Sequence, residues 1–197
     1  MSRLIKTLVL SLSIVALYGG DKDAPAFKPG PASSYETKLT IDKLTIAAEP
    51  YISDDKTREA FGNLNPYEYG ILPVLVVMQN DGDKVLRLDR MKVEYVIPRG
   101  DRIEATPPGD VPYVRPPKRP NVANPLPIPR RKGKNPLQKL EIESRSFAAR
   151  MLPPGQSAYG FFYFQTGHRP GATLYLTGIY EAATNKDLFY FEVPLDK

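Results

Sequence analysis

A ten-residue run at positions 70–79, GILPVLVVMQ, is apolar at odd and even positions alike. Such a run is expected of a central strand whose two faces are both buried. Pro73 has no amide hydrogen to donate to a neighbouring strand, so we expect an edge or a bulge at that position. The sequence NDGD at 80–83 then predicts a hairpin turn. The partner strand is expected at 85–97, with one core face and one solvent face.

Several other runs have the length and the alternation of β-strands. They lie at 37–48, 157–165, 173–181 and 187–193. In the first run the apolar parity switches across Asp42 and Lys43. A strand keeps its faces unless it bulges or changes sheets, so this switch predicts a first strand shared between two sheets.

Aromatic residues define the faces of the last strands. We expect Phe162 or Phe164 to face the interior. In the final strand, Phe189, Phe191 and Val193 are expected on the core side.

Two further segments have a mixed pattern. Residues 53–62 predict a short helix that Ser53 or Asp54 caps and that Gly62 ends. Residues 137–152 combine strand-like and helix-like spacing, and we expect a short strand followed by a helical turn.

The turn signals separate these runs without any alternation of strand and helix, which predicts an all-β fold. We expect an antiparallel, Ig-like β-sandwich with one short helix and a long Pro-rich basic insert. The closing stretch LPPGQSAYGFFYF, followed by a hairpin, resembles the end of Ig-like domains in exported bacterial proteins and lipoproteins. The resemblance covers residues 150–195 and implies a fold, while Ig-like domains carry many functions.

Residues 1–20, MSRLIKTLVLSLSIVALYGG, have the organisation of a bacterial signal peptide. Arg3 and Lys6 precede an apolar stretch from Leu8 to Leu17, which is shorter than the roughly 20 residues that a membrane span needs. The chain has no Cys, so lipid attachment through that residue is excluded. We expect export to the periplasm, the cell envelope or the extracellular space, with residues 1–20 either cleaved or kept as a membrane tether.

Residues 21–36 are rich in Pro, Gly, Ser and charge, and predict a linker that leads to one domain at 37–197. Within that domain, residues 106–136 hold ten of the 21 prolines and seven basic residues against one acid, which predicts an inserted loop. The candidate polyanion-binding residues of this loop are Arg115, Lys118, Arg119, Arg130, Arg131, Lys132 and Lys134. The expected partner is a protein or an anionic envelope component, such as a lipid headgroup or a cell-wall polymer. Nucleic acid is not expected, because the chain is exported and Tyr113 is the only aromatic residue of the loop.

Few residues of this chain suit catalysis or metal binding. Cys is absent and His168 is the only His, which excludes thiolate chemistry and multi-histidine metal sites. No cofactor-binding motif is present, so neither a cofactor nor a metal is expected. His168 is flanked by Gly and Pro residues and is expected on an exposed loop. The carboxylates that a hydrolase would use all lie in expected caps or turns: Asp54, Asp55, Asp81, Asp83, Asp101 and Glu104.

Tyr51, Tyr67 and Tyr69 are candidates for an exposed aromatic patch that stacks on sugars, or for tyrosines half-buried at one end of the sandwich. Our interpretation is an exported, non-catalytic, envelope-associated binding or accessory protein with no catalytic residues. One alternative is a carbohydrate-binding module, which a planar row of exposed tyrosines would support. The other is a carboxylate-dependent hydrolase, which needs two acids close together in a cleft.

Overall fold

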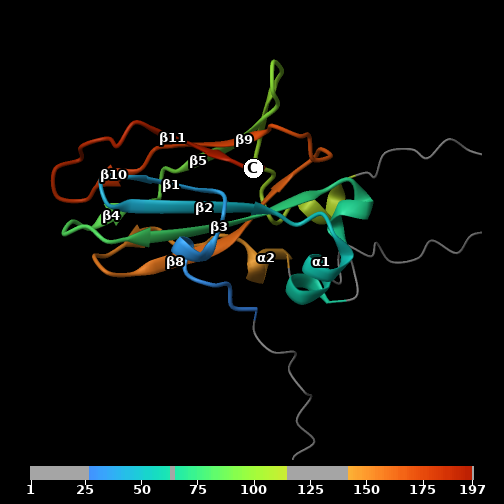
Figure 1. Ribbon diagram of the computed structural model, residues 1–197, viewed down its shortest axis with the longest axis horizontal. Helices are drawn as coiled ribbons and strands as arrows, with labels where there is room; N and C mark the ends of the chain where they lie inside the picture. Colours follow the sequence, from blue (N-terminus) through green and yellow to red (C-terminus); the bar gives the residue numbers. More distant parts are fainter. Residues whose placement is uncertain (1–26, 63–64, 115–141, 197) are drawn as a thin grey trace, which may run out of the picture.

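Two four-stranded antiparallel sheets face each other in the computed structural model, which describes residues 27–62, 65–114 and 142–196 (Figure 1). Sheet A has the order β1 (Lys38–Ile41), β2 (Leu44–Pro50), β3 (Leu72–Asn80), β8 (Ser157–Phe164). Sheet C has the order β11 (Tyr190–Pro194), β9 (Thr173–Thr177), β5 (Lys92–Val96), β6 (Arg102–Glu104). A small sheet B joins β10 (Tyr180–Glu181), β4 (Leu86–Arg87) and β7 (Met151–Leu152). The predicted all-β antiparallel sandwich is confirmed.

An inner core fills the space between sheets A and C. From sheet A it receives alternate residues of β3, among them Val74, Val76 and Met78, each fully buried. Sheet C contributes Tyr95, Leu174, Leu176, Phe191 and Val193. Phe164 lies in the same core, so the expected burial of Phe164 and Phe191 is confirmed.

An outer core covers the opposite face of sheet A. There Leu75 and Val77 of β3 pack beside Phe161 and Tyr163 of β8. A layer of short elements covers them: η1 (Ala32–Ser34), α1 (Asp54–Phe61), η2 (Pro66–Tyr69), η3 (Val111–Tyr113) and α2 (Ile142–Arg145). Figure 1 shows α1 and α2 on the side of β3 and β8 that faces away from β9 and β11. The strand at 70–79 is therefore apolar on both faces because each face is buried against a different layer.

The outer core corrects two expected boundaries. Phe27 is 7% exposed and Ala32 is fully buried, so residues 27–36 pack on the domain and do not form a linker. Val111 is also fully buried there, and the backbone N–H of Thr106 donates to the carbonyl of Tyr163 at 2.7 Å. The first part of the predicted insert, residues 106–114, therefore belongs to the folded domain.

The first strand is a hairpin and not a strand shared between sheets. Asp42 and Lys43 have φ values of 48° and 64° and form a two-residue turn between β1 and β2. Ile41 pairs directly with Leu44 across that turn, so both side chains lie on one face of the ladder. Across a two-residue loop, each odd-numbered residue pairs with an even-numbered one, and the two paired side chains lie on the same face. The apolar residues therefore switch from odd to even positions across the turn without changing face.

The edge predicted at Pro73 is confirmed at that position. β3 pairs with β2 and with β8, but the ladder with β2 stops at Val74, so Pro73 pairs with β8 alone. The Pro73 carbonyl still accepts a hydrogen bond from the Tyr51 N–H at 2.9 Å. The predicted hairpin at 80–83 is wrong, because β2 and β8 already occupy both edges of β3. The chain leaves sheet A, and 85–97 divides into β4 in sheet B and β5 in sheet C.

Three further expectations are corrected near the end of the chain. Phe189 is 74% exposed at φ 64°, so it does not share the core side of the last strand with Phe191. The short strand expected first in 137–152 lies partly outside the described residues; within 142–152 a helical turn, α2, precedes a short strand, β7, and α2 adds a second helix to the one expected. The strand expected at 173–181 is interrupted at Gly178, where φ is 76°.

Gly178 also marks a close approach between the β9–β10 connection and the β4–β5 turn. A Cβ atom there would lie 2.2 Å from the carbonyl oxygen of Arg90. Gly155 has a similar φ of 70°, but nothing lies within 4 Å of its would-be Cβ. We expect Gly155→Ala to lower the free energy of unfolding by about 1–2 kcal/mol, because an L residue is strained at this φ. Gly178→Ala should cost more than twice as much, because a backbone clash adds to that strain.

Urea unfolding of both variants measures this difference. Equal decreases in the free energy of unfolding of the two variants would mean that the backbone segments at Gly178 and Arg90 move apart at little cost.

Candidate functional site

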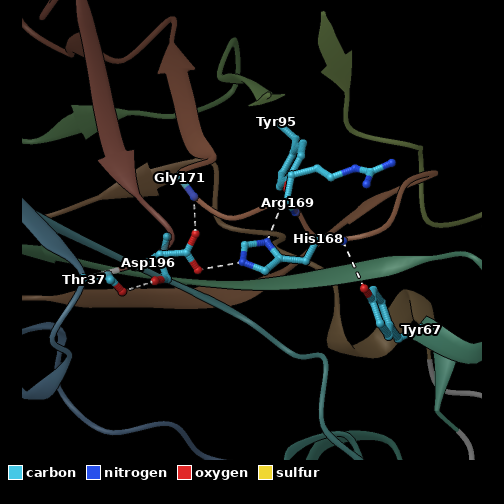
Figure 2. Close-up of polar contacts among 8 residues, drawn as sticks. Thr37, Tyr67, Tyr95, His168, Arg169, Gly171 and Asp196 are labelled. Atoms are coloured by element: carbon cyan, nitrogen blue, oxygen red, sulfur yellow. Dashed lines mark hydrogen bonds and ion pairs between the residues drawn. The ribbon is translucent and has the colours of Figure 1, made fainter. Parts of the chain in front are cut away.

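His168 lies on the loop between β8 and β9, and it is not the exposed loop residue that the sequence predicts. Its side chain is 9% exposed. The ring atom Nε2 lies 2.7 Å from Oδ1 of Asp196, which follows β11. The other ring nitrogen, Nδ1, lies 3.3 Å from the hydroxyl of Tyr95 on β5 (Figure 2). The prediction was wrong because both partners lie far away in the sequence.

We call Tyr67, Tyr95, His168 and Asp196 the histidine cluster. Backbone N–H groups add further hydrogen bonds to its side chains. The Tyr67 hydroxyl accepts the His168 N–H at 3.1 Å, and the Tyr95 hydroxyl accepts the Arg169 N–H at 2.7 Å. The second oxygen of Asp196 accepts the Gly171 N–H at 2.7 Å. The cluster joins η2, β5, the loop after β8 and the segment after β11. Figure 2 shows the side chains of the cluster converging around His168.

Hydrogen bonds occupy both ring nitrogens of His168. Nδ1 shares a hydrogen bond with the Tyr95 hydroxyl, which also accepts the Arg169 N–H. Nε2 donates to the Asp196 carboxylate, because an ionised carboxylate can only accept. Both ring nitrogens are therefore engaged within the chain.

Burial and hydrogen bonding act in opposite directions on Asp196. Burial raises the pKa of this carboxyl, but the hydrogen bonds from His168 and from the Gly171 N–H lower it, and the net pKa is below the ordinary value of 3.8. Burial raises the pKa of Tyr95, and the negative charge of Asp196 adds to that increase. At neutral pH the cluster therefore contains a carboxylate and a protonated phenol.

A cleft of about 680 Å³ lies beside the histidine cluster. Its polar lining comes from Glu36, Glu49, Ser53, Lys56, His168 and Asp196. Lys56 and Glu49 form an ion pair at 2.7 Å. Within the described ranges, no group of three or more His, Asp or Glu side chains is arranged to hold a metal ion.

The carboxylates that a hydrolase would use are distributed over separate elements. Asp54 and Asp55 begin α1, and Asp54 accepts a hydrogen bond from the Asn65 side chain at 2.8 Å. Asp81 and Asp83 lie after β3, while Asp101 and Glu104 belong to the β5–β6 hairpin. The three pairs of carboxylates therefore lie in three different regions of the sandwich: at the start of a helix, in a turn and in a hairpin.

The three candidate tyrosines do not form an exposed row. Tyr51 is 4% exposed and packs edge-on against Phe161 in the outer core, with ring centroids 4.9 Å apart. Tyr67 belongs to the histidine cluster, and Tyr69 is half-buried against the outer core. The prediction of an exposed aromatic patch at Tyr51, Tyr67 and Tyr69 is therefore wrong. Tyr51 is buried, Tyr67 packs against the inner core and Tyr69 packs against the outer core.

The seven candidate polyanion-binding residues, Arg115, Lys118, Arg119, Arg130, Arg131, Lys132 and Lys134, lie outside the described residues, as do residues 1–20. The described residues contain 15 Lys and Arg against 19 Asp and Glu, whereas the whole chain has a net charge of +5. The positive charge of the protein is therefore concentrated in the other segments. In the described ranges, no helix has the length and apolar character to cross a membrane.

The outer face of sheet C carries aromatic residues that the sequence reasoning missed. Tyr175 of β9 and Tyr190 of β11 stack with ring centroids 5.4 Å apart. Tyr190 is 54% exposed. Strand alternation could have predicted their outward position. Tyr175 is next to Leu174 and Tyr190 is next to Phe191, and neighbours of buried residues in a strand point to the opposite face.

Comparisons with known proteins give little further information. No family model matches the sequence, and no curated protein matches it. Among solved structures, a secreted protein from Mycobacterium tuberculosis, MPT63, is similar at 11% sequence identity, with 83% of this chain and 95% of that chain covered and a TM-score of 0.34.

The histidine cluster predicts an acid-dependent contribution to stability. The pKa of Asp196 is lowered by folding, so its contribution is complete above the ordinary carboxyl value of 3.8 and is lost as pH falls through the lowered pKa. Asp196→Asn should remove this pH dependence, and His168→Ala should lower the free energy of unfolding by about 1–3 kcal/mol at neutral pH.

Urea unfolding across the acidic range checks both effects. Asp101→Asn, at an exposed turn position, is the control and should retain the wild-type acid profile. An unchanged free energy of unfolding in His168→Ala would show that the cluster does not hold the fold together.

Proposed function

We propose that this chain is an exported, non-catalytic binding protein that acts through the surfaces of a rigid sandwich. The observation that carries the proposal is the internal use of the histidine cluster. Both ring nitrogens of His168 and both oxygens of Asp196 have partners within the chain. The side chains best suited to acid–base chemistry therefore act as cross-links between distant segments.

The pKa shift of Asp196 supports the same conclusion. A general acid or base works best when its pKa lies near the operating pH. Folding moves the pKa of Asp196 in the other direction, further below neutrality. A carboxylate that is tied to two donors and ionised at neutral pH is suited to orienting His168, not to transferring protons.

We also propose that the sandwich is Ig-like, and the strand order supports this. In the Ig arrangement, strands A, B and E share one sheet, while strands G, F and C share the other. Here β2, β3 and β8 are neighbours in sheet A, and β11, β9 and β5 are neighbours in sheet C. This correspondence makes β3 equivalent to strand B and β5 to strand C.

Export and an anionic envelope partner belong to the same proposal. The signal-like residues 1–20 support export. The charge separation supports electrostatic attraction, because the described domain is acidic while the segment that contains the seven candidate cations is basic. Co-sedimentation of the protein with anionic vesicles, weakening as salt rises, is the measurement for this second role.

The non-catalytic assignment is tested with purified protein and a panel of chromogenic esters, phosphoesters and glycosides. We expect no turnover above that of the His168→Ala and Asp196→Asn variants. Hydrolysis that the wild-type protein catalyses and both variants lose would overturn the proposal. A folding check by circular dichroism separates such a loss from unfolding of the variants.

A further inference from the structure

The outer face of sheet C differs from that of sheet A. Sheet A is covered by the helical layer, whereas the outward side chains of sheet C are exposed or half-buried. Strand pairing aligns them in rows across the four strands. The charged and aromatic members of this sheet C face are Lys92, Glu94, Arg102, Glu104, Tyr175, Tyr190 and Glu192.

Three of these side chains form a stack across the sheet. The guanidinium of Arg102 on β6 lies 4.3 Å from the ring centroid of Tyr175, and the ring of Tyr190 stacks with that of Tyr175 at an interplanar angle of 24°. Because β6 and β11 lie on opposite sides of β9, Arg102 and Tyr190 approach Tyr175 from opposite directions. Arg102 also donates to Glu94 at 3.1 Å, which holds the guanidinium in place.

The stack ends in exposed aromatic surface. Tyr190 is 54% exposed at the edge strand β11, and the preceding Phe189 is 74% exposed. Phe189 has a φ of 64°, a conformation that is unusual for a bulky residue, and its N–H donates to the Asp187 side chain at 2.9 Å. The local structure thus keeps two neighbouring aromatic rings in solvent where burial would be more favourable.

A hollow of about 360 Å³ adjoins the same face. Its polar border is formed by Lys92, Glu94, Glu104 and Thr177, and Met91 and Phe162 supply apolar lining. Thr177 is also the pairing partner of both Lys92 and Tyr190, so the hollow and the aromatic stack are adjacent. The face therefore combines stacked tyrosine rings with an adjoining hollow whose lining is part polar and part apolar.

We propose that the sheet C face binds a segment of an uncharged polysaccharide. This inference rests on the proposed function of a non-catalytic binding protein and names its ligand class. A pyranose ring has an apolar C–H face that packs on an aromatic ring, and its hydroxyls donate to carboxylates and accept from ammonium and guanidinium groups. Tyr190 on the edge strand β11 supplies the ring surface. Lys92 on β5 and Glu104 on β6 supply a donor and an acceptor two and three strands away, a distance that several sugar units of one chain would span.

Charge on this face distinguishes a neutral glycan from other ligands. A polyanion is disfavoured, because Glu94, Glu104 and Glu192 outnumber Lys92 and Arg102, and Arg102 is already paired with Glu94. A protein partner is disfavoured because the centres of protein interfaces are depleted in Lys and Glu. A polyol satisfies charged groups through its hydroxyls without needing a matching charge.

The test is titration calorimetry of the full chain with cellohexaose, xylohexaose, mannohexaose and N-acetylchitohexaose. We expect at least one to bind, and Tyr190→Ala to weaken that binding at least about tenfold. Tyr190→Phe keeps the ring and should retain most of the affinity. Tyr159→Ala is the matched control, because Tyr159 is 46% exposed on β8 in sheet A, and its loss should leave binding unchanged.

Each other outcome contradicts a defined part of the account. The absence of binding to all four oligosaccharides, or equal losses in Tyr190→Ala and Tyr159→Ala, would overturn the glycan site. Tight binding of a polyanion such as dextran sulfate that Tyr190→Ala weakens would also overturn it. Release of new reducing ends from a bound oligosaccharide would instead overturn the non-catalytic function, so the two failures are distinguishable.

Discussion

The central strand β3 presents apolar side chains on both of its faces, and neither face reaches solvent. Val74, Val76 and Met78 pack against sheet C, while Leu75 and Val77 pack under the helical layer. A strand of this kind needs a third layer, and the chain builds it from short segments that include Phe27, α1 and residues 106–114. Because that layer covers much of sheet A, the outer face of sheet C is the more exposed of the two sheet surfaces among the described residues.

Buried polar groups fix the two ends of β3. At its end, the Asn80 side-chain amide donates to the carbonyls of Lys84 and Leu152 at 2.8 and 2.9 Å and so links the turn to β7. Near its start, the histidine cluster links η2 to sheet C and to the segment after β11. Both arrangements satisfy polar groups that would be costly to bury alone. The residue that most resembled a catalytic side chain, His168, is thereby part of the frame.

Apolar alternation and helix start and stop signals in the sequence predict those parts of the structure that depend on neighbouring residues. The period of two places Phe191 and one of Phe162 and Phe164 in the core, and Phe164 and Phe191 are buried there. The cap and stop signals locate α1 at Asp54–Phe61. Contacts between distant residues are not visible to such patterns. His168 and Asp196 are 28 positions apart, and the Gly and Pro residues around His168 suggested exposure. The same limit explains Tyr51, whose burial depends on Phe27 and Phe161.

Amide hydrogen exchange tests the central claim most directly, because it reports the protection of each strand separately. If β3 is buried between two cores, its amides should be the slowest to exchange in the described domain and should exchange only through global unfolding. The edge strands β1 and β6 should exchange much faster, through local opening. Exchange of the β3 amides at the rate of β1 or β6 would contradict the account, because it would show that one of the two layers over β3 is not stably formed.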